Sequence, residues 1–258
     1  MSPLVVAGAG PSGLGCAMAL AAGSAHEVRL IDRIPVVGGE SGWANSDVMK
    51  LERQAKSVGV QFDLGITAIR WRGGELLVSG PGCVETIPAN HLFFAGGLRP
   101  PTVTDLGFTG DRPAGVIPAS VAEHLLSSGQ SLWSSVIIVG DGPWAARIAA
   151  HVHHSGGRVV AASNSAPAWA DELVPLPGRG EVIGRDRVAA LRLDGIELDC
   201  DAIILAGSPL PNRNVDGALT ESDPGVTFVQ PVGIDGVERR SNHGALVARA
   251  WLTKGAQR

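Results

Sequence analysis

The sequence has no tyrosine, and only 4% of its 258 residues are aromatic. A phenol is therefore excluded as a general acid. The three cysteines, Cys16, Cys83 and Cys200, are isolated, odd in number and without a CxxC pair. They give neither a disulfide framework nor a metal-binding knuckle, so we expect a reduced, cytoplasmic protein without a bound metal.

Basic clusters and long apolar runs are also missing. No group of lysines and arginines exceeds a pair, and the formal net charge is −4, so we expect no nucleic-acid or membrane partner. No stretch reaches the roughly 18 apolar residues of a membrane span. The apolar N-terminal segment lacks a basic flank and is interrupted by glycines, which favours a strand, a turn and a helix over a signal peptide.

Glycine, in contrast, is abundant, and a glycine-rich loop follows a short apolar run in LVVAGAGPSGLG. Gly8 permits a tight turn, Gly10 leaves room for a pyrophosphate to approach the backbone, and Gly13 allows the next helix to pack closely. That helix presents its N-terminal amides and the positive end of its dipole to the phosphates. Asp32 stands about 20 residues further on, where a carboxylate can accept the ribose hydroxyls of an adenosine.

The elements around this loop follow the order that a dinucleotide-binding unit requires. The apolar run at residues 4–7 predicts a buried strand, the stretch 12–22 a helix, and residues 27–31 a second strand. A Gly-Gly pair follows at 38–39, and a later apolar run, HLFF, is followed by AGG. The loop predicts a dinucleotide fold, but its chemistry alone does not separate FAD from NAD.

With the later segments included, the chain resembles the two-dinucleotide-domain flavoproteins, the broad group that contains thioredoxin reductase. The segment FTGDRPAGVIPASVAEHLL (residues 108–126) is similar to a linker in a narrower set of these proteins. That set comprises the FAD-containing subunits of opine oxidase, dye-linked proline and hydroxyproline dehydrogenases, and hydrogen cyanide synthase. The resemblance runs along nearly the whole chain, from Leu4 to about Leu252.

The resemblance implies an α/β fold with two nested Rossmann-like units and a small β-meander. The expected FAD-binding domain is discontinuous and comprises residues 1–112 and 212–258. A degenerate NAD(P)-type domain, residues 113–211, is inserted between them. The segment SVIIVGDGPWAARIAAHVHHSGGRVVAASN fits this plan, because it repeats the strand, glycine loop, helix and strand of the first unit.

The resemblance also implies which residues bind FAD. In the family, amides of the tail segment GIDGV approach the pyrimidine edge of the flavin, and the first loop and the AGG segment hold the rest. The expected cofactor-binding residues are Gly8, Gly10, Pro11, Ser12, Gly13, Asp32, Arg33, Gly39, Ala95, Gly96, Gly97, Gly236 and Val237. The sequence identifies no catalytic side chain and no metal site.

The second glycine loop departs from the pattern of a nicotinamide site. Ser163 stands where the first unit has Asp32, so no acid is present for a ribose diol, and Asn164 gives no arginine for a 2′-phosphate. We therefore expect FAD without NAD(P). Trp144 is either a core residue that packs helix on sheet or a bulky side chain that fills the vacant site.

The tail departs from the family as well. Where the family has Gly-Asp, whose carboxylate binds the ribityl chain, this sequence has Gln230-Pro231, and proline offers neither a carboxylate nor an N–H. Arg240 occupies a position that is usually a small alanine. These changes weaken the expected FAD site without removing it, since the first loop is intact. For Glu40, just after the Gly-Gly pair, we favour local packing over a role at the flavin.

The resemblance implies a compact FAD-binding oxidoreductase subunit that oxidises a C–N bond of an amine, amino acid or imine. A disulfide reductase is excluded, because the segments that would carry its cysteine pair contain none. A second flavoprotein or catalytic subunit is expected, because in the resembling enzymes such a subunit handles the amine. Two alternatives stay open: a non-catalytic structural or regulatory subunit derived from a flavoprotein, and a stand-alone flavin oxidoreductase of a specialised pathway.

Overall fold

The computed structural model describes residues 2–130, 132–212 and 223–255. The chain divides into two compact units: unit 1 is Met1–Leu98 with Pro211–Arg258, and unit 2 is Arg99–Leu210. The chain passes between the units at β8 (Leu98–Arg99) and β18 (Leu210–Pro211), which pair as a two-stranded sheet. Unit 2 is thus inserted into unit 1, which confirms the expected nesting.

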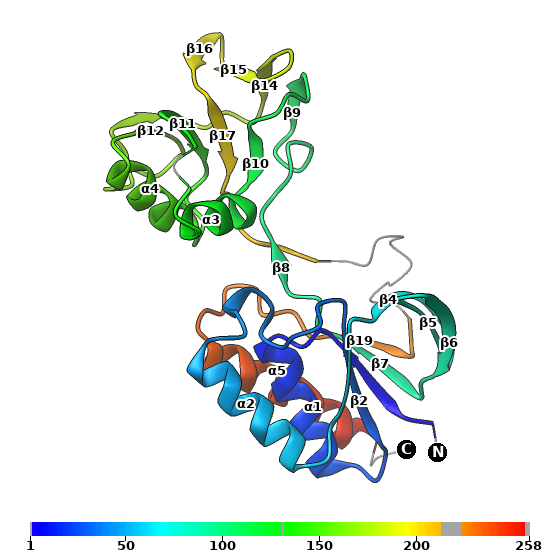
Figure 1. The fold of residues 1–258 in the computed structure, drawn as a ribbon. Helices are drawn as coiled ribbons and strands as arrows, with labels where there is room; N and C mark the ends of the chain where they lie inside the picture. Colours follow the sequence, from blue (N-terminus) through cyan, green and yellow to red (C-terminus); the bar gives the residue numbers. More distant parts are fainter. Residues whose placement is uncertain (1, 131, 213–222, 256–258) are drawn as a thin grey trace. The chain divides into compact units, whose positions relative to one another are not determined.

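Unit 1 is built on a five-stranded parallel sheet in the order β19-β7-β1-β2-β3 (Figure 1). Its strands are β1 (Leu4–Ala7), β2 (Val28–Asp32), β3 (Gln61–Leu64), β7 (His91–Phe94) and β19 (Val226–Phe228). Side chains of the central strand β1 alternate between two cores, because successive residues of a strand point to opposite faces. Leu4 and Val6 join the helical side, and Val5 and Ala7 join the other.

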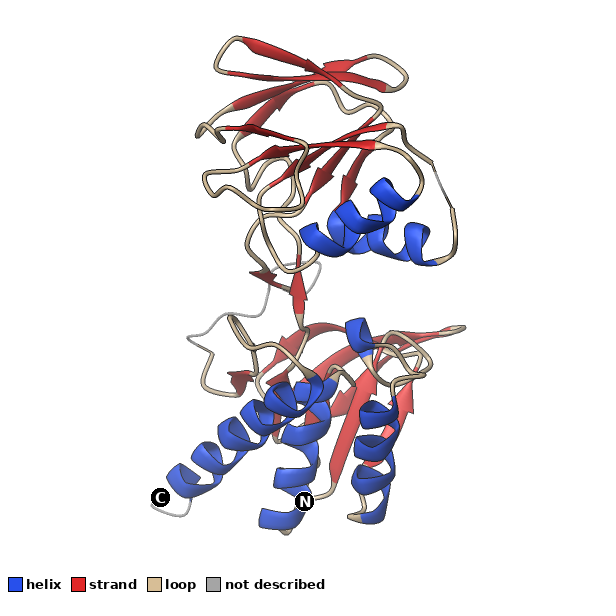
Figure 2. Ribbon diagram, turned by 90° about the vertical axis from the view of Figure 1, so that its left-hand side faces the viewer, coloured by secondary structure: helices blue, strands red, loops and turns tan. Residues whose placement is uncertain are grey.

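Three helices cover one face of this sheet (Figure 2): α1 (Pro11–Gly23), α2 (Ser46–Ser57) and α5 (Val237–Gly255). The Asn45 side chain caps α2 by accepting hydrogen bonds from two first-turn amides. Helices α1 and α5 approach closely at two glycines. A Cβ at Gly15 would overlap the carbonyl oxygen of Ser241, and a Cβ at Gly244 would overlap that of Ser12. The last helix is therefore seated directly on the first.

A three-stranded antiparallel sheet covers the other face of unit 1. It consists of β4 (Thr67–Arg72), β5 (Glu75–Gly80) and β6 (Cys83–Pro88). The β4–β5 turn is Gly73-Gly74, and both residues have positive φ, 47° and 105°, as a two-residue hairpin turn requires. The expected small β-meander is confirmed.

Unit 2 repeats this architecture with a five-stranded parallel sheet in the order β10-β17-β11-β12-β13. Its strands are β10 (Val116–Pro118), β11 (Ser135–Val139), β12 (Arg158–Ala162), β13 (Glu172–Val174) and β17 (Ala202–Leu205). Helices α3 (Ala119–Ser127) and α4 (Ala145–His154) cover one face (Figure 1). Val136 and Ile138 of β11 face these helices, whereas Ile137 and Val139 face the opposite core.

The opposite face of unit 2 packs on a second sheet, in the order β16-β15-β14-β9. Its strands are β9 (Phe108–Gly110), β14 (Gly180–Gly184), β15 (Val188–Leu193) and β16 (Ile196–Asp199). Residues 99–112, which the sequence assigned to the FAD-binding domain, lie in unit 2 because β9 pairs with β14. Within the described ranges, no helix combines the length and apolarity needed to cross a bilayer.

Candidate functional site

The glycine loop of unit 1 joins β1 to α1 and has one open face. Gly8 has φ of 120°, and a Cβ there would overlap the carbonyl oxygen of Ala95, so only glycine fits. A Cβ at Gly13 would overlap the carbonyl oxygen of Gly8. At Gly10, in contrast, no atom of the described residues lies within 4 Å of an added Cβ. Two glycines serve internal packing, and the third leaves the backbone accessible.

Asp32 lies beside this loop at the end of β2. Its Oδ2 accepts a hydrogen bond of 2.6 Å from the backbone N–H of Ala9, and its Oδ1 accepts one of 2.8 Å from that of Ile34. The two bonds fix the orientation of the carboxylate, and each oxygen keeps a second acceptor position. The Asp32 carboxylate at the edge of the loop is therefore fixed in orientation and can accept further hydrogen bonds.

The N-terminus of α1 faces the same loop. Gly10 is its N-cap and makes no side-chain cap, and Pro11 is the first helical residue. The described first turn contains no acidic side chain, so the partial positive charge of the helix end is not neutralised there. Ser12 is 6% exposed, and its hydroxyl has no hydrogen-bond partner among the described residues. This end of α1 has the features of an anion site.

Two further segments reach the same edge of the sheet. A Cβ at Gly39, in the short 3-10 helix η1 (Gly39–Ser41), would lie 3.5 Å from the Cα of Gly10. The backbone N–H of Ala95 donates to the carbonyl of Ala7 at 2.7 Å, directly after β7. The carboxyl ends of the parallel strands thus bring the first loop, η1 and residue 95 together, where open α/β sheets bind their ligands.

The remaining expected cofactor residues lie in three segments of unit 1, after Ala95, after Asp32 and at the start of α5. Gly96 and Gly97 follow Ala95, and the carbonyl of Gly97 accepts a hydrogen bond of 2.9 Å from Asn212. The backbone N–H of Gly236 donates to the Asp235 side chain at 2.8 Å, and Val237 is the first residue of α5. Arg33 follows Asp32 and is exposed.

One contact near this edge was not predicted. Arg240, in the first turns of α5, donates from Nη1 to Glu40 Oε2 at 3.4 Å and from Nε to the carbonyl of Ile234 at 3.1 Å. Its side chain is only 16% exposed. The ion pair links η1 to α5 across 200 residues of sequence, a separation at which no local pattern connects the two charges.

The tail that leads to α5 contains the Gln230-Pro231 pair. Gln230 follows β19, and its Nε2 is buried without a hydrogen-bond partner among the described residues. A buried amide group without a partner is destabilising by about 1–3 kcal/mol. Gln230, which departs from the family's sequence pattern, thus also has a buried donor without a hydrogen-bond partner among the described residues.

The glycine loop of unit 2 has the same spacing but a different fit. A Cβ at Gly142, the counterpart of Gly10, would overlap the carbonyl oxygen of Gly207. The N–H of Gly142 donates to the carbonyl of Ala206 at 2.7 Å. Helix α4 begins at Ala145, two residues later than the repeat predicts, because α1 begins immediately after its second glycine. The chain after β17 occupies the face that is open in unit 1.

Trp144 is a core residue. It is 1% exposed and packs with the residues under α3 and α4, among them Ile138 and Ile148. Of the two interpretations offered by the sequence, packing of helix on sheet is therefore the one that the structure supports.

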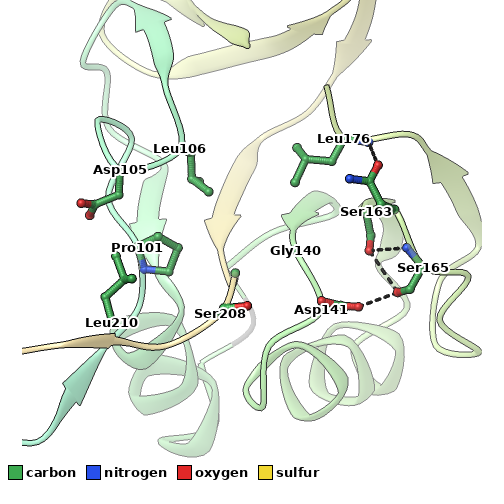
Figure 3. A pocket seen from close by; sticks show the side chains of 12 residues that line it. Pro101, Asp105, Leu106, Gly140, Asp141, Ser163, Ser165, Leu176, Ser208 and Leu210 are labelled. Atoms are coloured by element: carbon green, nitrogen blue, oxygen red, sulfur yellow. Dashed lines mark hydrogen bonds between the residues drawn. The ribbon is translucent and has the colours of Figure 1, made fainter. Parts of the chain in front are cut away.

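A cavity of about 360 Å³ lies next to this second loop, at the carboxyl ends of β11, β12 and β17 (Figure 3). The Ser165 hydroxyl donates to Asp141 Oδ2 at 2.6 Å, and the backbone N–H of Ser165 donates to the Ser163 hydroxyl at 3.1 Å. Ser163, at the place of Asp32, is 4% exposed and is held inside this network.

His153, near the end of α4, has a side-chain partner. His153 Nε2 lies 3.0 Å from Asp171 Oδ2, whose carboxylate also accepts from the backbone N–H of Val159. The hydrogen bonds from Val159 and His153 hold the pKa of Asp171 below its usual value. In the part of the chain that the structure describes, no three His, Cys, Asp or Glu side chains are grouped to hold a metal ion.

One buried titratable group lies at the opposite end of the unit 1 sheet, where β7 begins. His91 is 8% exposed, its Nε2 lies 2.9 Å from Thr227 Oγ1, and its ring contacts those of Phe93 and Trp251 with centroids 4.9 Å away. Burial lowers the pKa of His91 to about 4, against a smaller opposing effect of Asp223. This group belongs to the core and not to the candidate site.

No protein-family model matches the chain, and no curated protein sequence matches it. Solved structures do. The L-proline dehydrogenase from P. horikoshii is 17% identical with a TM-score of 0.66, and the match covers 99% of this chain and 56% of that one. A thioredoxin reductase from Lactococcus lactis is 15% identical with a TM-score of 0.65, covering 98% and 100%. A water-forming NADH oxidase from Lactobacillus brevis, solved with NADH, is 13% identical with a TM-score of 0.68, covering 96% and 69%.

At these identities the similarity shows the fold. The chain has the α/β fold with two Rossmann-like units that these oxidoreductases share, as the sequence predicted. It spans little more than half the length of the proline dehydrogenase chain and the full length of the thioredoxin reductase chain.

Proposed function

We propose that unit 1 binds FAD and that the protein is an FAD-dependent oxidoreductase subunit that takes part in oxidising a C–N bond. The observation that carries this proposal is the open backbone face at Gly10, next to the free end of α1 and the oriented carboxylate of Asp32. An amine or amino-acid substrate is supported by the linker at residues 108–126 and by the proline dehydrogenase among the similar structures.

The residues at this edge fit the cofactor. The Gly10 face and the first-turn amides of α1 suit a pyrophosphate, and the unpaired Ser12 hydroxyl offers one more hydrogen bond. The second acceptor positions of Asp32 suit the ribose hydroxyls. The backbone amide at Val237 suits the pyrimidine edge of a flavin, and the amide of Gly236 would have to exchange its bond to the Asp235 carboxylate for one to the flavin. Bound FAD would supply the hydride acceptor, and the chain would orient it and exclude water.

We further propose that unit 2 is a scaffold that does not use NAD(P). The NADH-bound oxidase shows that the fold can accept a nicotinamide. In this chain the Gly142 amide is already bonded to Ala206, and the backbone of Gly207 lies where a phosphate would approach. Asp141 adds a negative charge to the same loop, which repels a phosphate further.

A second subunit would supply the amine site. The chain contains no tyrosine, and two carboxylates at the open edge are already engaged. Asp32 accepts two backbone N–H groups, and Glu40 is paired with Arg240. A partner chain that brings its own base is the arrangement of the enzymes that the linker resembles. Expressed alone, the chain should therefore show no amine dehydrogenase activity with dyes.

A non-catalytic subunit is the second candidate, because the ribityl position carries Gln230-Pro231 in place of an acid. The absorption spectrum of purified protein separates the two. A flavin spectrum and release of FAD on denaturation would support the first proposal. Release of FMN, or a folded protein that takes up no flavin at micromolar FAD, would contradict it. Bleaching by micromolar NADH within seconds would contradict the assignment of unit 2.

A further inference from the structure

The cavity in unit 2 is lined by residues from several segments of that unit, whose side chains are drawn in Figure 3. Three segments line it after β11, β12 and β17, and the chain before β9 closes one side. Its volume of about 360 Å³ is in the range of small-molecule sites.

The glycine loop beside this cavity carries an acidic side chain, whereas the candidate nucleotide loop of unit 1 is uncharged. In unit 1 the residue between the first two glycines is Ala9, and the acid stands at the end of the second strand. In unit 2 the acid, Asp141, stands between the glycines, and Ser163 ends the strand. A carboxylate is therefore present in the second loop, next to Gly142, where the first loop has an uncharged alanine. The cavity disfavours anions and favours cations.

Asp141 is the uncompensated charge of the cavity. The other lining carboxylate, Asp105, accepts from Arg99 Nη1 at 2.6 Å and from the backbone N–H of Thr102 at 2.7 Å. Asp141 accepts one hydrogen bond from the Ser165 hydroxyl, and no ion pair involving it occurs within the described ranges. Among the residues that the structure describes, no lysine or arginine lines the cavity.

The polar side of the cavity is ordered before a ligand arrives. Ser165 donates its hydroxyl proton to Asp141, and its backbone N–H donates to Ser163. The first bond orients the carboxylate. Ser165 Oγ also lies 3.1 Å from Ser163 Oγ and accepts from it, which leaves one lone pair of Ser165 as a further acceptor. Pro101, Leu106 and Leu210 lie across the cavity from Ser165, and Leu176 lies above Ser163, beside Asn164 (Figure 3). The cavity thus combines an anionic, acceptor-rich side with an apolar side.

We propose that this cavity binds a small organic cation, an ammonium or guanidinium that carries a short apolar group. Asp141 is the counter-ion, Ser165 accepts a further N–H, and the apolar group lies against the leucine and proline side chains. The proposal concerns unit 2 only, and it holds whether or not unit 1 binds FAD.

A charge series of equal shape tests it: isoamylamine, isoamyl alcohol and isovalerate, titrated into the ¹⁵N-labelled full chain at pH 7. Isoamylamine should shift the amide signals of Gly140, Ser165 and Gly207 saturably, with a Kd on the order of 1 mM for so small a ligand. The alcohol should bind at least about fivefold more weakly, and isovalerate should give no saturable shift. Equal affinities, tighter binding of isovalerate or AMP, or no saturation by the amine would each overturn the proposal.

Asp141→Asn is the diagnostic variant, because its amide oxygen can still accept from Ser165. It should weaken isoamylamine binding about fivefold or more and leave the alcohol unchanged. Asp194→Asn is the matched control: it removes the same charge in the β15–β16 turn, at φ of 47°, a conformation that asparagine tolerates. It should bind the amine like the wild type. Wild-type affinity in a folded Asp141→Asn protein would overturn the assignment of the counter-ion.

Discussion

The two units carry the same glycine spacing at equivalent places in two parallel sheets, and only one of the two loops is open. The first glycine has the same role in both, because it lies against the chain that leaves the neighbouring strand, Ala95 in unit 1 and Gly207 in unit 2. The second glycine differs: Gly10 faces open space, and Gly142 faces the backbone of Gly207. The motif therefore specifies a close turn, and the exit segment of another strand decides whether a ligand can reach it.

The largest expected effect comes from filling the closed loop. Gly142→Ala should destabilise unit 2 by about 3 kcal/mol, because the new Cβ overlaps backbone that cannot move away like a flexible side chain. Urea unfolding with hydrogen exchange at β11 and α4 measures this. Gly178→Ala is the control, since no described atom lies within 4 Å of its Cβ, and it should change stability by less than about 0.5 kcal/mol. Equal stability of the two variants would show that the loop of unit 2 is not closed.

The stabilities of the two units should also respond differently to acid, because the histidine that is buried among the described residues, His91, belongs to unit 1. Its folded pKa is about 4, below the ordinary 6.5, so the unfolded chain takes up this proton first as the pH falls. Unit 1 should lose about 3 kcal/mol of stability between pH 6.5 and pH 4, and no more from this group below pH 4.

Urea unfolding at a series of pH values tests this, with His91→Gln compared with the wild type. The variant should lose that part of the pH dependence and keep the rest. His124→Gln, an exposed histidine of unit 2, should behave like the wild type. If His91→Gln keeps the full pH dependence, another group is responsible for the acid sensitivity of unit 1.

Filling the open loop should have a smaller effect on the fold and a clear one on the ligand. Gly10→Ala introduces a Cβ that meets no described atom, and its φ is not in the left-handed region, so unfolding should change by less than about 1 kcal/mol. FAD affinity, titrated with deflavinated protein, should fall about 10- to 100-fold, because the Cβ stands where the pyrophosphate approaches. Unchanged affinity, with Gly178→Ala as the reference, would mean that the cofactor does not lie over Gly10.

The sequence predicted the order of elements closely, because each rests on local patterns. The strand at Leu4–Ala7 is observed as predicted, the apolar run His91–Phe94 forms β7, and α1 differs from its predicted bounds by one residue at each end. The sequence assigned residues 99–112 to the FAD-binding domain, but they lie in unit 2, because β9 pairs with β14, some 70 residues later. The closure of the second loop and the Glu40–Arg240 pair depend on equally remote segments. Contacts of this kind are set by the tertiary fold and leave no local signal.

The seating of α5 on α1 constrains the order in which the protein can form during synthesis. Unit 2 is encoded by one continuous segment, whereas β19 and α5 of unit 1 emerge from the ribosome after it. Translation at about 5–20 residues per second leaves on the order of 10–40 s between the emergence of α1 and that of α5. Until then the face of α1 that carries Ser12 and Gly15 has no partner helix. The surface of α1 that α5 covers in the folded protein therefore stays without that cover until the C-terminal segment has emerged.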